Sequence, residues 1–414
     1  MVSEVKLLQP RLRFVDFHDD WTQQRIGSIL TDISRPVQLL DNELYQLVTV
    51  KRRNEGVVPR SVVKGKNILV KNYFAIKAGD FLISKRQVVH GANGIVPEYL
   101  DNAVVSNEYL VVTDNQKITA KFWSTISKRP EIKKLYFISS YGVDIEKLVF
   151  DIADWKERSI LIPELNEQQK ITDFFQNLDQ QIKLHQDKHN KLQQLKQAML
   201  GKMFTKTGEN VPEVRFSGFS EEWQRKTLGD ITSSFSGGTP AVGVHEYYGG
   251  DIPFIRSGEI NSSQTALFIT QEGLANSSAK VVNVGCILYA LYGATSGEVA
   301  ISKINGAINQ AILAMHPKNG YSAKFIALWL LREKQEITSS FLQGGQGNLS
   351  GSIIKNLAFD FPNYEEQEKI GEYFQNLDNL IALQQQKINK LKNIRLACLE
   401  KMFVSQHIKL KISR

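Results

Sequence analysis

The side chains in this sequence with the clearest capacity for binding chemistry are cationic, and they gather in one stretch. Between Lys51 and Arg86 there are ten Lys or Arg residues and two acidic residues. Positive charge of this density is typical of a surface that follows the phosphates of a nucleic acid. A merely solvated charged face is the alternative. The candidate phosphate-contacting residues are Lys51, Arg52, Arg53, Arg60, Lys64, Lys66, Lys85 and Arg86.

A second candidate binding region is polar rather than charged. Between positions 230 and 360 there are eight basic and nine acidic residues, so charge alone would not attract DNA there. Gly-rich loops at 233–240, 291–299 and 343–352 carry hydroxyl and amide side chains instead. Glycine lets a backbone approach a phosphate or base edge closely, and Asn and Gln pair with adenine. Plain turns are the alternative for each loop. The candidates are Ser236, Gly237, Gly238, Thr239, Arg256, Tyr292, Thr295, Ser296, Gln343, Gln346 and Asn348.

Sequence patterns for catalysis are missing. The sequence has no HExxH, no GxSxG, no Walker-type phosphate loop and no zinc-spaced Cys/His cluster. It also lacks the DPPY- or NPPY-like tetrapeptide of amino-methyltransferases. His185 and His189 stand four apart on a predicted helix but have no third ligand nearby. We therefore predict no catalytic residues, no metal site and no cofactor bound by this chain.

The composition is that of a folded protein with several domains. The 414 residues are 42% apolar, and Lys plus Arg exceed Asp plus Glu by 51 to 43. The first residues lack the apolar run of a signal peptide, and no apolar stretch reaches the length of a membrane span. We expect a soluble, cytoplasmic protein with no membrane partner.

The chain repeats itself at an offset of about 200 residues. PRLRFVDFHDDW, at 10–21, returns as PEVRFSGFSEEW, at 212–223. A longer pair lies at 163–204 and 362–403, where 22 of 42 aligned positions are identical. The chain is therefore a duplication in which two unlike segments alternate with two similar ones.

Each long repeat predicts one long helix. Apolar residues recur with a 4,3 spacing from Ile171 and from Ile370, which is the mark of a coiled-coil seam. If the helices pair, chain connectivity makes them antiparallel and puts the element at 10–30 near the end of the second helix. Two unrelated amphipathic helices, each packed on its own domain, are the alternative. The predicted subunit-interface residues are Phe175, Leu178, Ile182, Leu192, Phe374, Leu377, Ile381 and Leu391.

The predicted fold class is α+β, with a pseudo-twofold internal duplication. Two mixed α/β domains are separated by two long antiparallel coiled-coil helices, because short β-like runs broken by Gly, Pro and Asn fill the segments between the repeats. The predicted segments are an α/β domain at 1–162, a helix at 163–206, an α/β domain at 207–361, a helix at 362–404 and a tail at 405–414.

This organisation resembles the specificity subunit of type I restriction–modification systems over nearly the whole chain. The likeness rests on the paired EQQKI and EEQEKI segments, the two FQNLD segments and the two KMF endings. In the second domain, SGGTP, YGATSGEVAI and INQAIL look like the family's recognition-domain motifs. The first domain has no GGTP, and its HGANGIVP is only partly similar to YGATSG. Asn93 becomes a candidate DNA-binding residue through that segment.

The resemblance implies a non-catalytic DNA reader with two target recognition domains and a bipartite double-stranded DNA target. It also implies two modification subunits, which bind S-adenosylmethionine and dock through the helices. Two restriction/translocation subunits, which use ATP and Mg, would join through that core. A coiled-coil scaffold that never contacts DNA is one alternative, and the basic stretch argues against it. The specificity part of a single-chain restriction or methylation enzyme is another, and the missing catalytic motifs argue against it.

Overall fold

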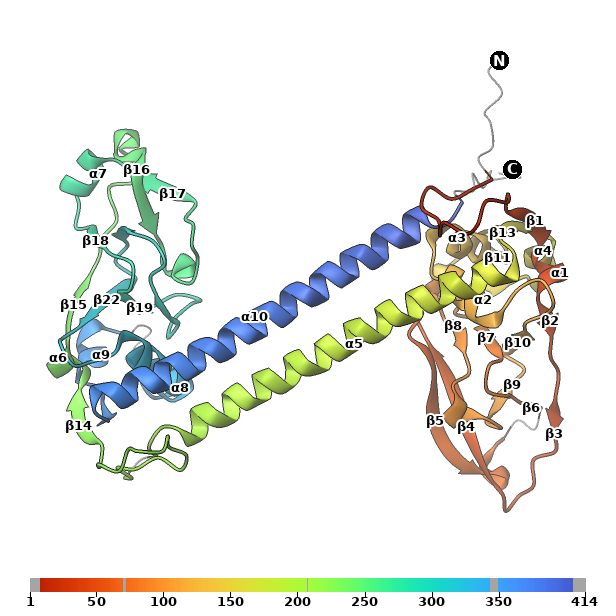
Figure 1. Cartoon of the computed structure of the whole chain (residues 1–414), viewed down its shortest axis with the longest axis horizontal. Helices are drawn as coiled ribbons and strands as arrows, with labels where there is room; N and C mark the ends of the chain where they lie inside the picture. Colours follow the sequence, from red (N-terminus) through yellow and green to blue (C-terminus); the bar gives the residue numbers. More distant parts are fainter. Residues whose placement is uncertain (1–7, 70–71, 207, 343–348, 405–414) are drawn as a thin grey trace. The chain divides into compact units, whose positions relative to one another are not determined.

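The computed structural model describes residues 8–69, 72–206, 208–342 and 349–404 of the chain. The chain forms two compact units, one made of residues 1–185 and 387–414 and the other of residues 186–386. Each unit therefore contains one mixed α/β domain together with part of each long helix (Figure 1). None of the helices in the described ranges is both long and apolar enough to cross a membrane.

The first unit is built on two main sheets. Its strands are β1 (Thr22–Arg25), β2 (Thr31–Asp32), β3 (Pro36–Val37), β4 (Leu44–Lys51), β5 (Gly56–Lys64), β6 (Tyr73–Ala75), β7 (Phe81–Ser84), β8 (Asn93–Ile95), β9 (Val104–Ser106), β10 (Tyr109–Thr113), β11 (Ser140–Tyr141), β12 (Val149–Phe150) and β13 (Ser159–Ile162). One sheet has the order β2-β10-β7-β8 and the other β3-β6-β9-β4-β5, while β1–β13 and β11–β12 form antiparallel pairs.

Short helices cover these sheets. They are α1 (Ile26–Ile29), α2 (Ala120–Ile126), α3 (Pro130–Ile138) and α4 (Ile152–Glu157), with 3-10 turns η1 (Gly65–Asn67), η2 (Val88–His90), η3 (Glu98–Leu100) and η4 (Ile145–Lys147). Their starts follow from local sequence: the Thr119 hydroxyl caps α2, and Pro130 occupies the first turn of α3, where its missing N–H is not needed. The largest core cluster among the described residues joins Trp123 and Trp155 of these helices to Phe175 of α5 (Leu165–Lys202) and to Phe403, just after α10 (Tyr364–Lys401).

The second unit repeats this plan with its own elements. Its strands are β14 (Gln224–Thr227), β15 (Thr232–Ser236), β16 (Tyr248–Ile255), β17 (Leu267–Ile269), β18 (Lys280–Val282), β19 (Ile287–Ala290), β20 (Val299–Ile301), β21 (Gly306–Ile308), β22 (Ile312–Pro317) and β23 (Ala358–Phe361). Its helices are α6 (Leu228–Ile231), α7 (Gln271–Ala275), α8 (Ala323–Leu342) and α9 (Gly351–Asn356), with η5 (His245–Tyr247) and η6 (Ser257–Glu259). Its sheets have the orders β15-β22-β19-β20 and β17-β16-β21-β18, and β14 pairs with β23.

The two domains share one topology, although their sequences retain only traces of it. The sheet β2-β10-β7-β8 corresponds strand for strand to β15-β22-β19-β20, and β6-β9-β4-β5 corresponds to β18-β21-β16-β17. In the described ranges each unit also has one parallel pairing, between β4 and β9 in the first and between β16 and β21 in the second. The α+β fold class with an internal duplication is confirmed, and the duplication includes the unlike segments.

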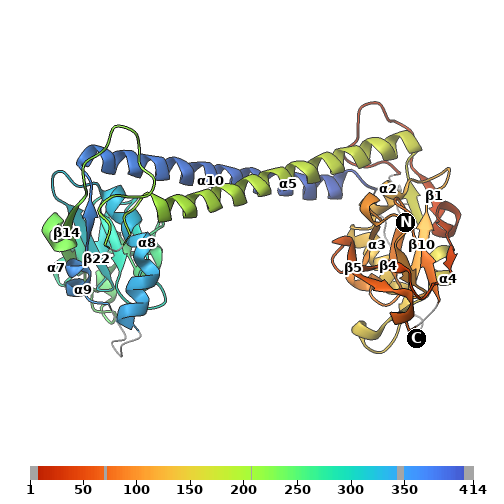
Figure 2. The same ribbon diagram turned by 90° about the horizontal axis from the view of Figure 1, so that it is seen from below.

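The long helices are α5 (Leu165–Lys202) and α10 (Tyr364–Lys401), of 38 residues each. Within each unit they lie side by side and antiparallel (Figures 1 and 2): in the first, Phe175 of α5 packs with Phe403 just after α10, and in the second, Phe374 of α10 shares a core with Phe204 just after α5. The residues at the predicted 4,3 spacing are buried or half-buried along both helices. The antiparallel arrangement predicted from connectivity is therefore found.

The short repeat closes each unit against the end of a long helix. The backbone N–H of Leu12 donates to the carbonyl of Lys401 over 2.9 Å, and the N–H of Val214 donates to the carbonyl of Lys202 over the same distance. The N-terminal element thus lies at the end of α10 just as its twin lies at the end of α5. This confirms the position predicted for it.

The paired Glu-Gln dipeptides at the helix starts explain part of the long repeat. Glu167 and Glu366 are fully buried, and each accepts two hydrogen bonds of 2.7–2.8 Å from an arginine of the short repeat, Arg13 or Arg215. The neighbouring Gln168 side chain donates to the carbonyls of Pro163 and Lys117 and accepts from the N–H of Thr119. Gln367 makes the corresponding bonds in the second unit. These dipeptides tie the short repeat, the long helix and the domain together.

Candidate nucleic-acid interface

The basic turn of the first unit, Lys51-Arg52-Arg53, lies at the tip of the β4–β5 hairpin. All three residues are exposed. Arg53 and Asn54 take left-handed backbone angles, with φ of 61° and 58°. The turn is held against the β7–β8 loop, because the N–H of Arg53 donates to the carbonyl of His90 over 2.7 Å and that of Asn54 to Gly91 over 2.8 Å. The cations are therefore presented from a fixed backbone.

The other predicted cations do not all join this turn. Lys64 pairs with Leu44 at the opposite end of the hairpin, seven residues along β4 from Lys51, or about 24 Å away at 3.4 Å per residue. Lys66 follows it in η1, and Arg60 lies midway along β5. Lys85 and Arg86 lie in the β7–β8 loop beside the turn, since Arg52 donates to Gln87 over 2.7 Å. The sequence stretch thus supplies two separate basic regions.

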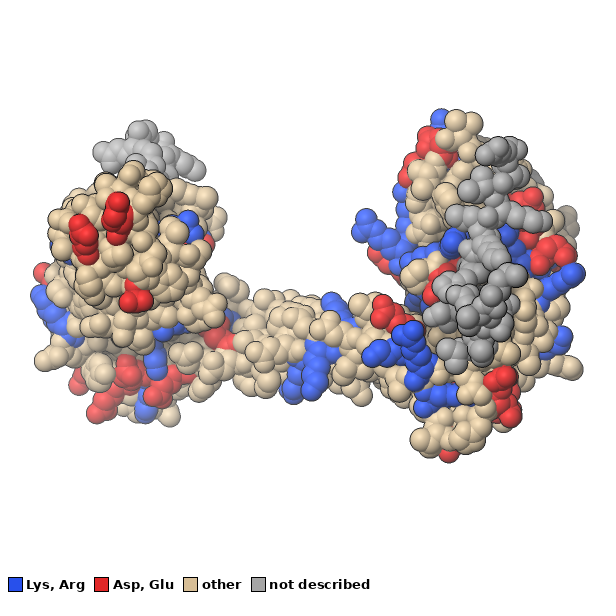
Figure 3. All heavy atoms as spheres, turned by 90° about the horizontal axis from the view of Figure 1, so that it is seen from above, with Lys and Arg blue, Asp and Glu red and all other residues tan. Residues whose placement is uncertain are grey.

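Some of this positive charge is already neutralised within the unit. Arg52 forms an ion pair with Glu146 at 2.7 Å, and Arg86 forms one with Glu108 at 3.1 Å. Lys51 and Arg53, by contrast, form no ion pair with any residue in the described ranges. Figure 3 shows residues other than Lys, Arg, Asp and Glu over most of the second unit on the face in view, whereas blue and red side chains are spread over the first. Lys51 and Arg53 are the strongest phosphate-binding candidates.

The prediction for Asn93 is corrected by its position. Asn93 is buried at the start of β8, where its Oδ1 accepts from the Asn54 amide over 3.0 Å and from the Ser127 hydroxyl over 3.2 Å. A side chain enclosed by these partners cannot reach a base edge. It fixes the basic turn to the domain instead.

The candidate loops of the second unit converge at one place. The N–H of Gly238 donates to the carbonyl of Ile308 over 3.1 Å, and the Thr239 hydroxyl donates to Gln310. The N–H of Leu291 donates to the carbonyl of Ala311 over 2.8 Å. The segments SGGTP, INQAIL and YGATSG, which are far apart in sequence, therefore meet at the ends of β15, β21 and β19.

Some residues of these loops pack inside the domain, and others are exposed to solvent. A Cβ atom on Gly237 would lie 1.9 Å from the carbonyl oxygen of Ile308, and one on Gly238 would lie 2.5 Å from Ser278. Both glycines are therefore needed for close packing inside the domain; Gly238 is buried and Gly237 is half-buried. Ser296 is half-buried and its hydroxyl donates to the carbonyl of Leu291, so it also holds the loop.

Ser236 and Thr239 are exposed, and Tyr292 and Thr295 are half-buried, all at the loops or the ends of their strands. Burial raises the pKa of the Tyr292 phenol. Gln343, Gln346 and Asn348 lie outside the described residues. The structure adds Gln310, which is exposed beside Thr239 and was not among the candidates. Gln310 belongs to the INQAIL motif, but only its contact with Thr239 in the folded domain identifies it as a candidate DNA-binding residue.

The predicted interface residues on the helices divide by burial. Phe175, Leu178, Phe374 and Leu377 belong to the cores of their own units, so these four side chains are not available to a partner. This corrects their assignment, while Ile182, Leu192, Ile381 and Leu391 are half-buried. The helices also carry exposed apolar residues at repeat-related positions outside the predicted set: Leu184 and Leu383 are 65% and 42% exposed, and Leu195 and Ile394 are each 38% exposed.

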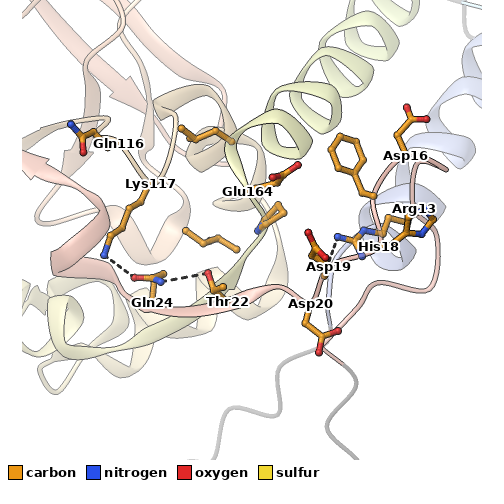
Figure 4. Close-up of a pocket in the computed structure, with 14 residues that line it drawn as sticks. Arg13, Asp16, His18, Asp19, Asp20, Thr22, Gln24, Gln116, Lys117 and Glu164 are labelled. Atoms are coloured by element: carbon orange, nitrogen blue, oxygen red, sulfur yellow. Dashed lines mark hydrogen bonds between the residues drawn. The ribbon is translucent and has the colours of Figure 1, made fainter.

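A hollow of about 560 Å³ lies in the first unit between the short repeat and the start of α5 (Figure 4). Asp16, Asp19, Asp20 and Glu164 line it together with Arg13 and other residues. These four carboxylates outnumber the cations of the lining, Arg13 and Lys117, which disfavours a phosphate there, so the hollow is not included in the candidate interface. Among the described residues no cluster of His, Cys, Asp or Glu is placed to hold a metal ion.

Two stretches of the chain, residues 18–194 and 220–393, match the model of the type I restriction modification DNA specificity domain. The chain belongs to this family. Its two matched stretches correspond to the two copies of the repeat. Membership assigns the chain to DNA sequence recognition and not to catalysis.

Relatives support the family at both the sequence and fold levels. The HindI specificity subunit of Haemophilus influenzae is 23% identical over 91% of this chain and 98% of its own length. The MjaIX specificity subunit of Methanocaldococcus jannaschii is 28% identical over 44% of each chain, so the chain spans less than half of that relative.

Solved structures share the fold. The S subunit of a type I system from M. genitalium has a TM-score of 0.60 at 16% identity, covering 96% of this chain and 100% of its own. The HsdS subunit from Thermoanaerobacter tengcongensis has a TM-score of 0.50 at 18% identity, covering 93% and 97%. Identities this low support the fold alone.

Proposed function

We propose that the chain is the sequence-reading subunit of a type I restriction–modification complex, in which each α/β domain reads one half of a bipartite DNA target. The observation that carries this proposal is one topology used twice with different surface chemistry. In the first unit the β4–β5 hairpin presents a basic turn, whereas in the second unit the loops around Thr239 and Gln310, at the ends of β15 and β21, are polar. Two α/β domains with the same topology but different surface residues can recognise two different half-sites.

The exposed apolar residues of the helices support a partner that binds twice. Leu184 and Leu383 are related by the repeat, as are Leu195 and Ile394. Exposed apolar side chains that recur at equivalent positions fit two copies of one protein partner. That partner is the modification subunit. Restriction/translocation subunits would join through it, and S-adenosylmethionine, ATP and Mg would be held by these partners and not by this chain.

Segment exchange tests the proposal. Residues 207–361 are replaced by the equivalent segment of a relative with a different target, and the methylated motif is mapped in cells that also carry the modification subunit. One half of the motif should change and the other half and the spacer should stay. The matched control exchanges the first domain, residues 1–162, and should change only the other half. A change in both halves, or in neither, would refute two independent readers.

A salt series on the unmodified complex separates this function from a scaffold. Specific DNA binding that weakens steeply with salt is expected, because the first unit presents cations to phosphates. Assembly with the modification subunit but no DNA binding at any salt concentration would instead favour the scaffold.

A further inference from the structure

Arg256 stands at the point where the candidate loops of the second unit meet. It follows directly after β16, whose last residue, Ile255, accepts a hydrogen bond of 3.2 Å from the N–H of Asn309, directly after β21. These strands are parallel, so Arg256 and Asn309 leave the sheet at the same edge. Gln310 and Thr239 are bonded to each other at this edge.

The guanidinium of Arg256 is held by Glu259. Its Nε lies 3.0 Å from one carboxylate oxygen of Glu259, and its Nη2 lies 3.2 Å from the other. Glu259 is itself fixed, since it also accepts from the N–H of Ala266 over 3.0 Å. The Thr265 hydroxyl, which donates to the carbonyl of Phe254 over 2.7 Å, lies 3.3 Å from the same carboxylate. Hydrogen bonds and charge from Arg256, with the N–H of Ala266, outweigh the opposing effect of burial and hold the pKa of Glu259 down to about 2. The carboxylate is therefore charged and rigidly placed at neutral pH.

This arrangement leaves one edge of the guanidinium for a ligand. Nε and one side of Nη2 are used by Glu259, and no described residue bonds to Nη1. The Arg256 side chain is still 48% exposed. The remaining Nη1–Nη2 edge offers two parallel N–H donors, the pattern that matches O6 and N7 of guanine in the major groove. Because Glu259 fixes the side chain, little rotamer freedom remains to be lost on binding.

A phosphate contact is a weaker explanation for this pair. The second unit has no excess of basic residues between 230 and 360, so its DNA binding would not rest mainly on attraction to phosphates. A neighbouring carboxylate lowers the local positive potential, which disfavours a non-specific phosphate contact. The two parallel N–H donors of Arg256 can still recognise a base, because base recognition depends on hydrogen-bond geometry.

We propose that Arg256 reads one guanine of the half-site recognised by the second unit, and that Glu259 is its positioning residue. This inference rests on the proposed function and assigns one base to one side chain of that unit.

The test uses Arg256→Lys and Glu259→Gln in the full chain, expressed with its modification subunit, with the methylated motif mapped in cells. Lysine keeps the charge and an ion pair to Glu259 but has no second parallel donor. It should relax one guanine position of one half-site, with a loss of discrimination of roughly 10- to 100-fold there, and leave the other half-site unchanged. Glu259→Gln should relax the same position to a smaller extent.

Arg225→Lys is the matched control, because Arg225 is also exposed and ion-paired, to Asp360. It should leave the motif unchanged. Thermal unfolding of each purified complex shows whether a variant is folded. If Arg256→Lys preserves the full motif, or if Arg256→Ala weakens all sites equally without relaxing a base, the guanine assignment is overturned. If the unmodified chain directs no bipartite motif, the proposed function fails, which is a different result.

Discussion

The guanidinium of Arg395 on α10 is bonded to Asp179 on α5, with 2.5 Å between Nε and Oδ1. Lys196 and Asp378, which stand 199 positions from these residues in the repeat, form the corresponding ion pair in the second unit, also at 2.5 Å. Two ion pairs at equivalent positions select the same antiparallel register in both units. A shift of one helix against the other would separate both pairs.

A double-mutant cycle on Asp179 and Arg395 should give a small favourable coupling. Asp179 is 45% exposed, so solvent screens the pair and we expect about 0.5–1 kcal/mol, decreasing with salt. Asp179→Asn also removes a favourable partner of Lys128, whose pKa is lowered mainly by burial. Urea unfolding of the two single variants and the double variant measures the coupling. A coupling of zero at low salt would show that the pair does not stabilise the register.

Removing the buried carboxylate of Glu167 should have a much larger effect. Glu167→Ala leaves the guanidinium of Arg13, whose side chain is only 12% exposed, without its carboxylate partner, and we expect a loss of about 3–5 kcal/mol in unfolding free energy. Glu366→Ala should behave alike through Arg215. Glu213→Ala is the control, because its pairs with Lys202 and Lys206 are half-exposed and should contribute under about 1 kcal/mol. Similar losses at the buried and exposed sites would contradict this ranking.

The basic turn should show its role in the salt dependence of DNA binding. Replacing Lys51 and Arg53 with Ala should reduce the slope of log affinity against log salt by about two, because each phosphate contact contributes about 0.9. Replacing Arg52 alone should reduce the slope by less than one, since Glu146 already pairs with it. The affinity is measured over a salt series. An unchanged slope in the Lys51/Arg53 variant would remove the turn from the interface.

Each copy of the modification subunit should depend on one of the two repeat-related leucines, Leu184 or Leu383. Leu184→Glu should weaken one copy and Leu383→Glu the other, so each single variant yields a complex with one modification subunit and the double variant yields none. Val62→Glu is the control, because Val62 is 58% exposed but lies on β5, away from the helices. Native mass spectrometry counts the subunits. Two bound copies in the double variant would place the docking surface elsewhere.

The long helices should set the spacer between the half-sites. Four helix-forming residues inserted after Gln186 and after Gln385 add about 6 Å and about 400° to each helix, close to one full turn. The half-site sequences should persist while the spacer grows by one or two base pairs, at about 3.4 Å each. Two-residue insertions, which turn each helix by about 200°, should impair activity. An unchanged spacer with full activity in the four-residue variant would mean that the partner subunits position the domains.

Much of this architecture could be predicted from local patterns. The 4,3 spacing of apolar residues indicated both long helices, because a helical seam repeats within a few turns and needs no distant information. The order of the repeats was enough to place the element at 10–30 beside the end of α10, since two antiparallel helices bring those ends together.

What only the tertiary structure decided is which polar residues face outward. Asn93 and the glycines of SGGTP looked suited to DNA by residue type, yet they are packed within the protein. Arg52 is as basic as Arg53, but a carboxylate 94 positions away in the sequence neutralises it. Thr239 meets Gln310 across 71 positions. Such contacts arise from the pairing of distant strands, and residue type and local spacing hold no record of which strands will pair.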